Sequence, residues 1–143
     1  MAVIVILGII AVIAIPLISN IISKSKTDAD VATARQVYDA ARLYIINEKN
    51  GDFKNKVVNI ASTSTNTDSL QGKGYLEAGI VLPSSKNPIT GGSVTFDANG
   101  ELASTAGVTI STTAPSGGTN DSKSYSADEV MKAKATTTTT TTP

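Results

Sequence analysis

The chain begins with an unbroken apolar segment. Residues 1–22 read MAVIVILGIIAVIAIPLISNII, and the first charged side chain is Lys24. As a helix with a rise of about 1.5 Å per residue, this segment spans roughly 33 Å, close to the hydrocarbon thickness of a bilayer. Valine and isoleucine fill twelve of its positions, and both lose rotamer freedom in a helix. The pattern therefore predicts a helix that is stabilised by burial in lipid or in the core of an assembly.

A cleaved secretory signal is the simplest alternative for such a beginning. It requires a basic residue before the apolar core, a shorter core and a small-residue cleavage site after it. The segment has no basic residue before its core and no such site after it. The sequence thus favours a helix that is retained.

Two residues interrupt the apolar helix, Gly8 and Pro16. Proline lacks an N–H group and disfavours helical geometry at the preceding residue, so we expect a kink or a local loss of helix there. A glycine lets neighbouring helices approach closely. The stretch between these two residues is therefore a candidate for losing its helix when neighbouring chains pack around it.

Residues 23–50 continue the helix with a different pattern, because charges of both signs alternate with apolar residues at spacings of three and four. This spacing predicts an amphipathic helix that packs its apolar stripe on a sheet. The stripe consists of Val31, Ala34, Tyr38, Ala41 and Ile45, widened by Val37, Leu43 and Tyr44. Asn50-Gly51 is expected to end the helix, since glycine tolerates the left-handed conformation that follows a last turn.

Residues 51–112 are predicted to form a loop and a small antiparallel sheet. Val57–Ile60 and Val108–Ile110 are strand candidates. Between them, SVTFDANGEL alternates apolar and polar residues and turns at Asn99-Gly100, with Glu101-Leu102 beginning the return strand. Too few large apolar residues remain for a second core, so the sheet is expected to cover the stripe of the helix. The predicted fold class is α+β, a long N-terminal helix packed on a small antiparallel sheet.

Residues 113–143 consist mainly of Ser, Thr, Gly and Lys and are interpreted as a polar C-terminal tail. Within them, Ser126 and Glu129 match a capping box for a short helix through Ala135. The run of threonines at the end is either a disordered terminus or a site of O-glycosylation. The candidate positions for O-glycosylation are Thr136, Thr137, Thr138, Thr139, Thr140, Thr141 and Thr142.

Composition argues against catalysis. The chain has no cysteine and no histidine, which excludes disulfides, thiolate metal sites and the commonest general base. Twelve basic residues balance twelve acidic ones, so no basic excess exists to neutralise the phosphates of a nucleic acid. No glycine-rich phosphate loop is found either. We expect no enzyme activity, no cofactor and no metal.

Two groups of residues with side-chain oxygens are candidate cation ligands. Asp28 and Asp30 stand two apart and point away from each other on a helix, so they are expected to be solvated rather than to bind a metal. Asp97, Asn99 and Glu101 alternate around a turn, but the further acidic positions of a calcium loop are absent. A hairpin turn is the better interpretation of these three residues.

The apolar N-terminus resembles that of type IV pilins and of the pseudopilins of type II secretion. MAVIVILGIIAVIAIPLISN has the spacing of glycine to proline that is typical of this family, with Gly8 and Pro16 at the matching positions. The resemblance is specific over residues 1–22, extends to the sheet through about residue 112, and does not cover the tail. It implies a mature N-terminus about six residues before Met1, with the family's glutamate two residues before Met1.

The resemblance implies a structural subunit of an extracellular type IV pilus filament, used in adhesion, twitching motility or DNA uptake. Residues 1–22 would lie in the cytoplasmic membrane before assembly and in the filament core afterwards, with Gly8 and Pro16 marking the stretch that melts. The chain would bind copies of itself as an open helical polymer. Its other partners would be a prepilin peptidase, a platform protein and an assembly ATPase, and no direct nucleic-acid binding is expected.

Two alternatives stay open. One is a pseudopilin of a type II secretion system, and the other is a membrane-anchored surface binding domain that does not polymerise. The charges after the span bear on orientation, since Lys24 and Lys26 taken alone would place the C-terminal side in the cytoplasm. The basic leader typical of the family would reverse that orientation.

Overall fold

The computed structural model of the protein describes residues 1–61, 67–116 and 118–135. Two helices and four strands make up this part of the chain. They are α1 (Ala2–Glu48), β1 (Val57–Asn59), β2 (Ile89–Thr95), β3 (Val108–Thr112), β4 (Asp121–Tyr125) and α2 (Ala127–Ala135). The strands form one antiparallel sheet in the order β1-β2-β3-β4. The predicted α+β class is confirmed.

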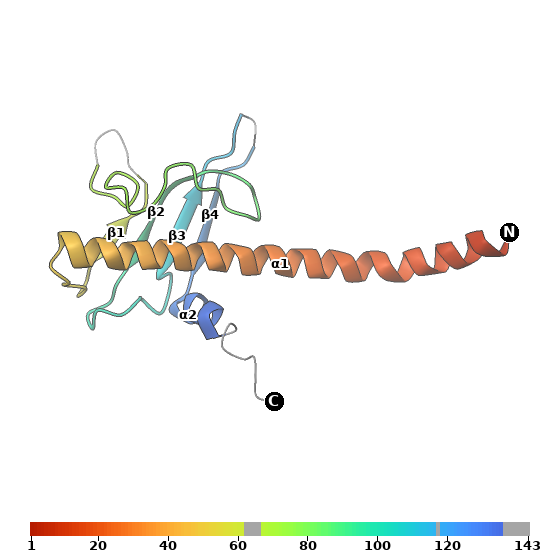
Figure 1. The fold of residues 1–143 in the computed structure, drawn as a ribbon, viewed down its shortest axis with the longest axis horizontal. Helices are drawn as coiled ribbons and strands as arrows, with labels where there is room; N and C mark the ends of the chain where they lie inside the picture. Colours follow the sequence, from red (N-terminus) through yellow and green to blue (C-terminus); the bar gives the residue numbers. More distant parts are fainter. Residues whose placement is uncertain (62–66, 117, 136–143) are drawn as a thin grey trace.

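Helix α1 crosses one face of the sheet with its C-terminal half, and its N-terminal half projects away from the rest of the molecule (Figure 1). We call the sheet, its loops, α2 and the packed half of α1 the head. The helix ends where Lys49 and Gly51 both donate their backbone N–H groups to the carbonyl of Ile45, at 3.0 Å each. Asn50 and Gly51 have φ values of 54° and 77°, the left-handed geometry expected at this stop.

The core of the head lies between α1 and the sheet. On α1, the side chains of Ala34, Val37, Tyr38, Ala41, Tyr44 and Ile45 are buried, and Val31 packs against them partly buried. The sheet and its loops contribute Val58, Ile60, Leu70, Leu82, Val94, Phe96, Val108 and Ile110. Leu43 was expected to widen this stripe, but it is 55% exposed because it lies on the side of α1 that faces away from the sheet.

The hairpin around Asn99-Gly100 forms in a shorter version than expected. Asp97 accepts hydrogen bonds from the backbone N–H groups of Asn99 and Glu101 at 2.8 and 3.0 Å, which makes these residues a turn. Only one bridge, between Phe96 and Leu102, continues the pairing within the described residues. The strand that pairs with β2 is therefore β3. Its pairing begins where the Thr95 N–H donates to the carbonyl of Gly107 and where Val108 lies opposite Val94.

The position of Gly92 in β2 requires a glycine. Its φ is 110°, and a Cβ atom there would lie 2.0 Å from the carbonyl oxygen of Thr109 on β3. No other residue fits so close to a neighbouring strand. The position lies just after the register irregularity between Ile89 and Gly91, so the glycine lets β2 continue its pairing past that irregularity.

The boundary expected between the head and a polar tail at residue 112 needs correction. Strand β4 pairs with all five residues of β3, and Tyr125 and Val130 belong to the core. The capping box is present, because Ser126 Oγ and N both donate to the Glu129 carboxylate at 2.9 and 2.8 Å at the start of α2. The head therefore extends to Ala135. The threonines proposed for O-glycosylation, residues 136–142, lie outside the described residues.

Candidate functional site

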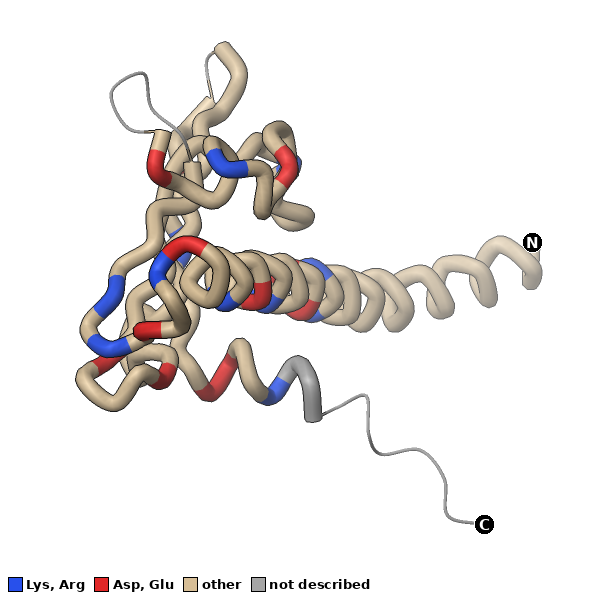
Figure 2. The backbone as a smooth tube through the Cα atoms, turned by 60° about the vertical axis from the view of Figure 1, so that its left-hand side comes forward, with Lys and Arg blue, Asp and Glu red and all other residues tan. Residues whose placement is uncertain are grey.

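Residues 2–22, which we call the free half of α1, carry most of the exposed large apolar side chains among the described residues. Every Val, Ile and Leu side chain from Val3 to Ile22 is exposed, with exposed fractions between 49% and 75%. Lysine, arginine, aspartate and glutamate are absent from this half of the helix and begin where it approaches the head (Figure 2). Covering such a side chain stabilises a protein by about 1.5–3 kcal/mol, so this surface is suited to lipid or to another protein. By length and composition the helix can cross a membrane.

Gly8 and Pro16 both lie in this free half. In the single chain the helix is unbroken through both residues, so the interruption expected at Pro16 is not observed in this state. Ser19 Oγ donates a hydrogen bond to the carbonyl of Ile15 at 3.1 Å, one turn beyond the proline. A Cβ atom on Gly8 would meet nothing within 4 Å. Neither residue contacts the head, so any role for them involves other molecules.

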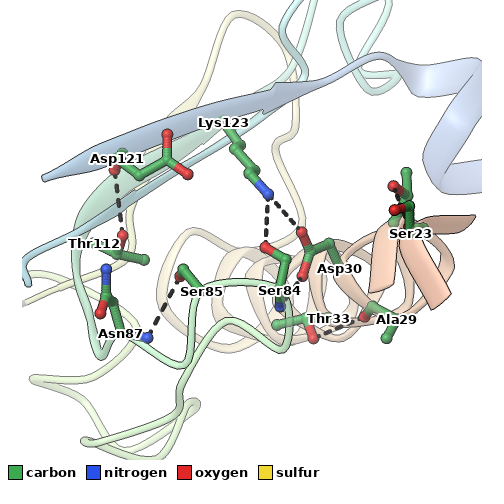
Figure 3. A network of polar contacts seen from close by, with 11 residues as sticks. Ser23, Ala29, Asp30, Thr33, Ser84, Ser85, Asn87, Thr112, Asp121 and Lys123 are labelled. Atoms are coloured by element: carbon green, nitrogen blue, oxygen red, sulfur yellow. Dashed lines mark hydrogen bonds and ion pairs between the residues drawn. The ribbon is translucent and has the colours of Figure 1, made fainter. Parts of the chain in front are cut away.

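A buried ion pair fixes α1 to the head close to the point where the free half leaves it. The Asp30 carboxylate on α1 receives Lys123 Nζ from β4 at 2.8 Å and the backbone N–H of Ser84 at 2.9 Å. Lys123 Nζ also donates to Ser84 Oγ at 2.6 Å. Figure 3 shows the three residues converging from a helix, a strand and a loop. The cluster thus joins three parts of the chain that are distant in sequence.

The environment of Asp30 keeps it charged. Its side chain is only 2% exposed, and this burial by itself raises the pKa of the carboxyl group. The hydrogen bonds from Lys123 and Ser84, together with the positive charge of Lys123, outweigh the burial and hold the pKa below its ordinary value of 3.8. The carboxylate is therefore ionised and paired at neutral pH.

The expectation that Asp28 and Asp30 are both solvated is wrong for one of them. Asp28 is exposed, but Asp30 is buried because it lies four residues before Ala34, on the same face of the helix. That spacing is a signal in the sequence that extends the buried stripe back to residue 30. No local signal identifies Ser84 and Lys123 as its partners, since Lys123 is 93 residues away.

A second group of contacts fixes the other end of the packed half. The Tyr44 hydroxyl donates to the Asp68 carboxylate at 2.5 Å. The ring of Tyr44 packs edge-on against that of Tyr75, with the ring centroids 5.6 Å apart. Burial first, and the Asp68 carboxylate second, raise the pKa of Tyr44 far above its ordinary range. The ring of Tyr38 packs against that of Phe96, with the ring centroids 6.0 Å apart. Tyr38 therefore packs beside the end of β2, as expected, whereas Tyr44 packs against the loop that carries Asp68 and Tyr75.

Tyr125 is an exception to this pattern of satisfied polar groups. Its side chain is 6% exposed, and among the described residues its hydroxyl has no hydrogen-bond partner. Burial first, and the nearby carboxylate of Asp30 second, raise the pKa of this hydroxyl well above its ordinary range. A buried hydroxyl without a partner destabilises a fold by about 1–3 kcal/mol.

Tyr125→Phe is therefore expected to raise the free energy of unfolding by about 1 kcal/mol. The measurement is chemical denaturation of the full chain in detergent solution. Tyr44→Phe is the matched control, because it removes a hydroxyl that has a partner and should lower the free energy of unfolding by about 1 kcal/mol. Equal losses in the two variants would contradict the interpretation of Tyr125.

A groove of about 410 Å³ opens beside α1, between the Asp97–Glu101 turn and α2. We call it the flank groove. Its apolar lining consists of Tyr38, Phe53, Phe96, Leu102 and Met131. Arg42 and Glu101 also line it, and both are exposed. Within the described residues, neither of them forms an ion pair with another side chain, and no cluster of acidic residues suited to a metal ion is found.

Comparison with protein-family models, with curated proteins and with solved structures found no match for this chain.

Proposed function

We propose that this protein is the structural subunit of a type IV pilin-like filament. The observation that carries the proposal is the free half of α1, an uncharged apolar helix that projects from a well-packed head and has nothing to cover it in the single chain. The spacing of Gly8 to Pro16 within it resembles that of type IV pilins. An apolar helix of this kind can rest in the cytoplasmic membrane and then pass into the centre of a filament without entering water.

The same geometry supports an order of events. Residues 1–22 hold the chain in the membrane, with the head outside it. Assembly proteins of the kinds expected for pilins, a peptidase, a platform protein and an ATPase, then move the chain into an extracellular polymer. In the polymer the apolar helices of neighbouring chains cover one another, and the heads form the outer surface. Stacking with the same contact at every step yields an open helical filament.

Electron microscopy of material sheared from the cell surface tests this proposal. We expect long filaments that contain this chain. A short structure confined to the cell envelope would favour a secretion pseudopilus instead. A chain found only in the membrane fraction, with no filaments, would leave a simple anchor with a surface domain and would refute the proposal.

Gly8 and Pro16 supply the variant test. The double variant G8A/P16A is expected to reach the membrane in normal amounts, because alanine preserves the apolar helix and has the highest helix propensity. Filament yield or extensibility should change, since the stretch between these residues then resists local loss of helix. Val12→Ala, which lies between them and alters only side-chain size, should have a smaller effect. Unchanged filaments in G8A/P16A would exclude a role for this stretch in assembly.

A further inference from the structure

The flank groove has a counterpart on the opposite side of α1. Figure 1 shows α2 and the Asp97–Glu101 turn on one side of the helix and the loop of residues 77–88 on the other. We call residues 77–86 the flank loop. Val81, at its centre, is 46% exposed, whereas the next residue, Leu82, is fully buried.

The flank loop holds Val81 in a fixed position. Val81 forms a bridge with Pro88, the Leu82 N–H donates to the carbonyl of Asn87 at 3.0 Å, and the Lys86 N–H donates to the carbonyl of Leu82 at 2.7 Å. Leu82 itself is anchored in the core. Since the loop is already ordered, presenting Val81 to a partner costs little conformational entropy.

The charges beside the two features are complementary. The flank groove carries one cation and one anion, Arg42 and Glu101, while the flank loop carries Glu77 and Lys86, both exposed. No ion pair joins any of these four side chains to another residue in the part of the chain that the structure describes. Arg42 lies over the ring of Tyr38, with its Cζ atom 5.9 Å from the ring centroid.

We infer that the flank groove receives the flank loop of a second copy of this chain. Val81 enters between the aromatic rings and Met131, and the paired charges are Arg42 with Glu77 and Glu101 with Lys86. A groove of about 410 Å³ has room for a valine and the backbone that carries it. Opposite charges that meet across such a contact set its register and exclude other orientations.

This contact is heterologous, because the groove and the loop lie on different sides of the same head. A bound pair therefore still offers one free groove and one free loop, and the contact repeats without closing unless the rotation between copies forms a ring. The inference rests on the proposed function for its setting, a filament held together by the apolar helices. It adds a specific contact between heads to that arrangement.

Cysteine cross-linking tests the inference, because the chain has no cysteine of its own. In the double variant V81C/M131C, oxidation of assembled material is expected to give a ladder of covalent multimers on a non-reducing gel. A disulfide requires Cα atoms within about 7 Å, and positions 81 and 131 lie on opposite sides of α1, so a bond between them joins different copies. Each single variant should remain free of the ladder.

The matched control is L43C/M131C, in which the first cysteine occupies a position of α1 that faces away from the sheet and is at least as exposed as position 81, at 55% against 46%. It should give no ladder. The absence of a ladder in V81C/M131C, or an equal ladder in the control, would overturn the inference even where filaments form normally. If the unmodified chain forms no filaments, the proposed function fails, but the contact can still be tested by oxidising V81C/M131C in membranes. A ladder of multimers there supports the contact, and the absence of a ladder overturns it.

Charge reversal provides an independent measurement. Arg42→Glu is expected to lower the yield of filaments several-fold, because the groove then repels Glu77 of the next copy. R42E/E77R should restore the yield, since the two charges are exchanged and not removed. A double variant no better than R42E would overturn the pairing.

Discussion

Ile10→Lys is expected to abolish filament formation and to release much of the chain from the membrane. Ile10 lies near the middle of the free half of α1 and is 56% exposed in the single chain. A lysine at the centre of a membrane-spanning helix costs about 2.5–3.5 kcal/mol on insertion scales. This penalty corresponds to a loss of roughly 100-fold in partitioning. In a filament core, the same charge has no water and no partner.

The measurement is fractionation of cells that express the full chain, together with electron microscopy of sheared material. Leu43→Lys is the matched control, because Leu43 is equally exposed and lies on the same helix but belongs to the head. We expect that variant to remain in the membrane. If Ile10→Lys partitioned and assembled like the unmodified chain, the apolar half of α1 would be buried in neither lipid nor a filament core.

Lys123→Met is expected to produce the largest loss of stability in the head. It leaves the Asp30 carboxylate buried, with Ser84 as its remaining hydrogen-bond partner. Removing one member of a buried ion pair costs about 3–5 kcal/mol, and because Lys123 is 35% exposed, we expect about 3 kcal/mol. The melting temperature should fall by roughly 10 °C, measured by thermal unfolding of the full chain in detergent.

Two further variants show whether the charge on Asp30 is the cause. Lys56→Met removes a cation from a pair with Asp52 whose side chains are 39% and 57% exposed, so it should cost less than about 1 kcal/mol. D30N/K123M should be more stable than K123M, because it leaves no buried charge and the asparagine oxygen can still accept from Ser84. A K123M variant as stable as K56M would refute the role assigned to this cluster.

The same pair gives the head an acid sensitivity. The pKa of Asp30 is lowered in the folded state, so its contribution to stability is complete above the ordinary carboxyl pKa of 3.8 and is lost as the pH falls through the lower folded value. Asp68 and Glu129 also have lowered pKa values and contribute in the same direction. In D30N, the fall in stability below about pH 4 should be shallower than in the unmodified chain.

Local patterns along the chain were enough for the helix and for parts of the sheet. An uncharged apolar run, a stripe at spacings of three and four and an Asn-Gly stop are properties of neighbouring residues, so α1 could be placed almost to its ends. The same holds for β1, β3 and the capping box of α2. The apolar half of α1, which carries the proposed function, could thus be recognised from residues 1–22 alone.

Strand β4 shows why local patterns were insufficient for the rest. Its sequence, DSKSY, has a single large apolar residue and resembles a loop, but an edge strand needs only one buried side chain and the backbone of its neighbour. Pairing with β3 supplies the hydrogen bonds, and that pairing brings Lys123 over Asp30. The five residues of β4 alone therefore do not predict either its pairing with β3 or the contact of Lys123 with Asp30.

The sequence by itself determined that residues 1–22 form a helix that is apolar on every side and suited to burial, because the tendency of a side chain to leave water is a property of its own apolar surface. Only the tertiary structure decided how the head is fixed to that helix. The burial of Asp30, its pairing with Lys123 and the position of the groove opposite the flank loop arise from contacts between residues far apart in the chain. Such contacts depend on which surfaces the sheet brings together, and the spacing of apolar residues along the chain does not predict which surfaces those are.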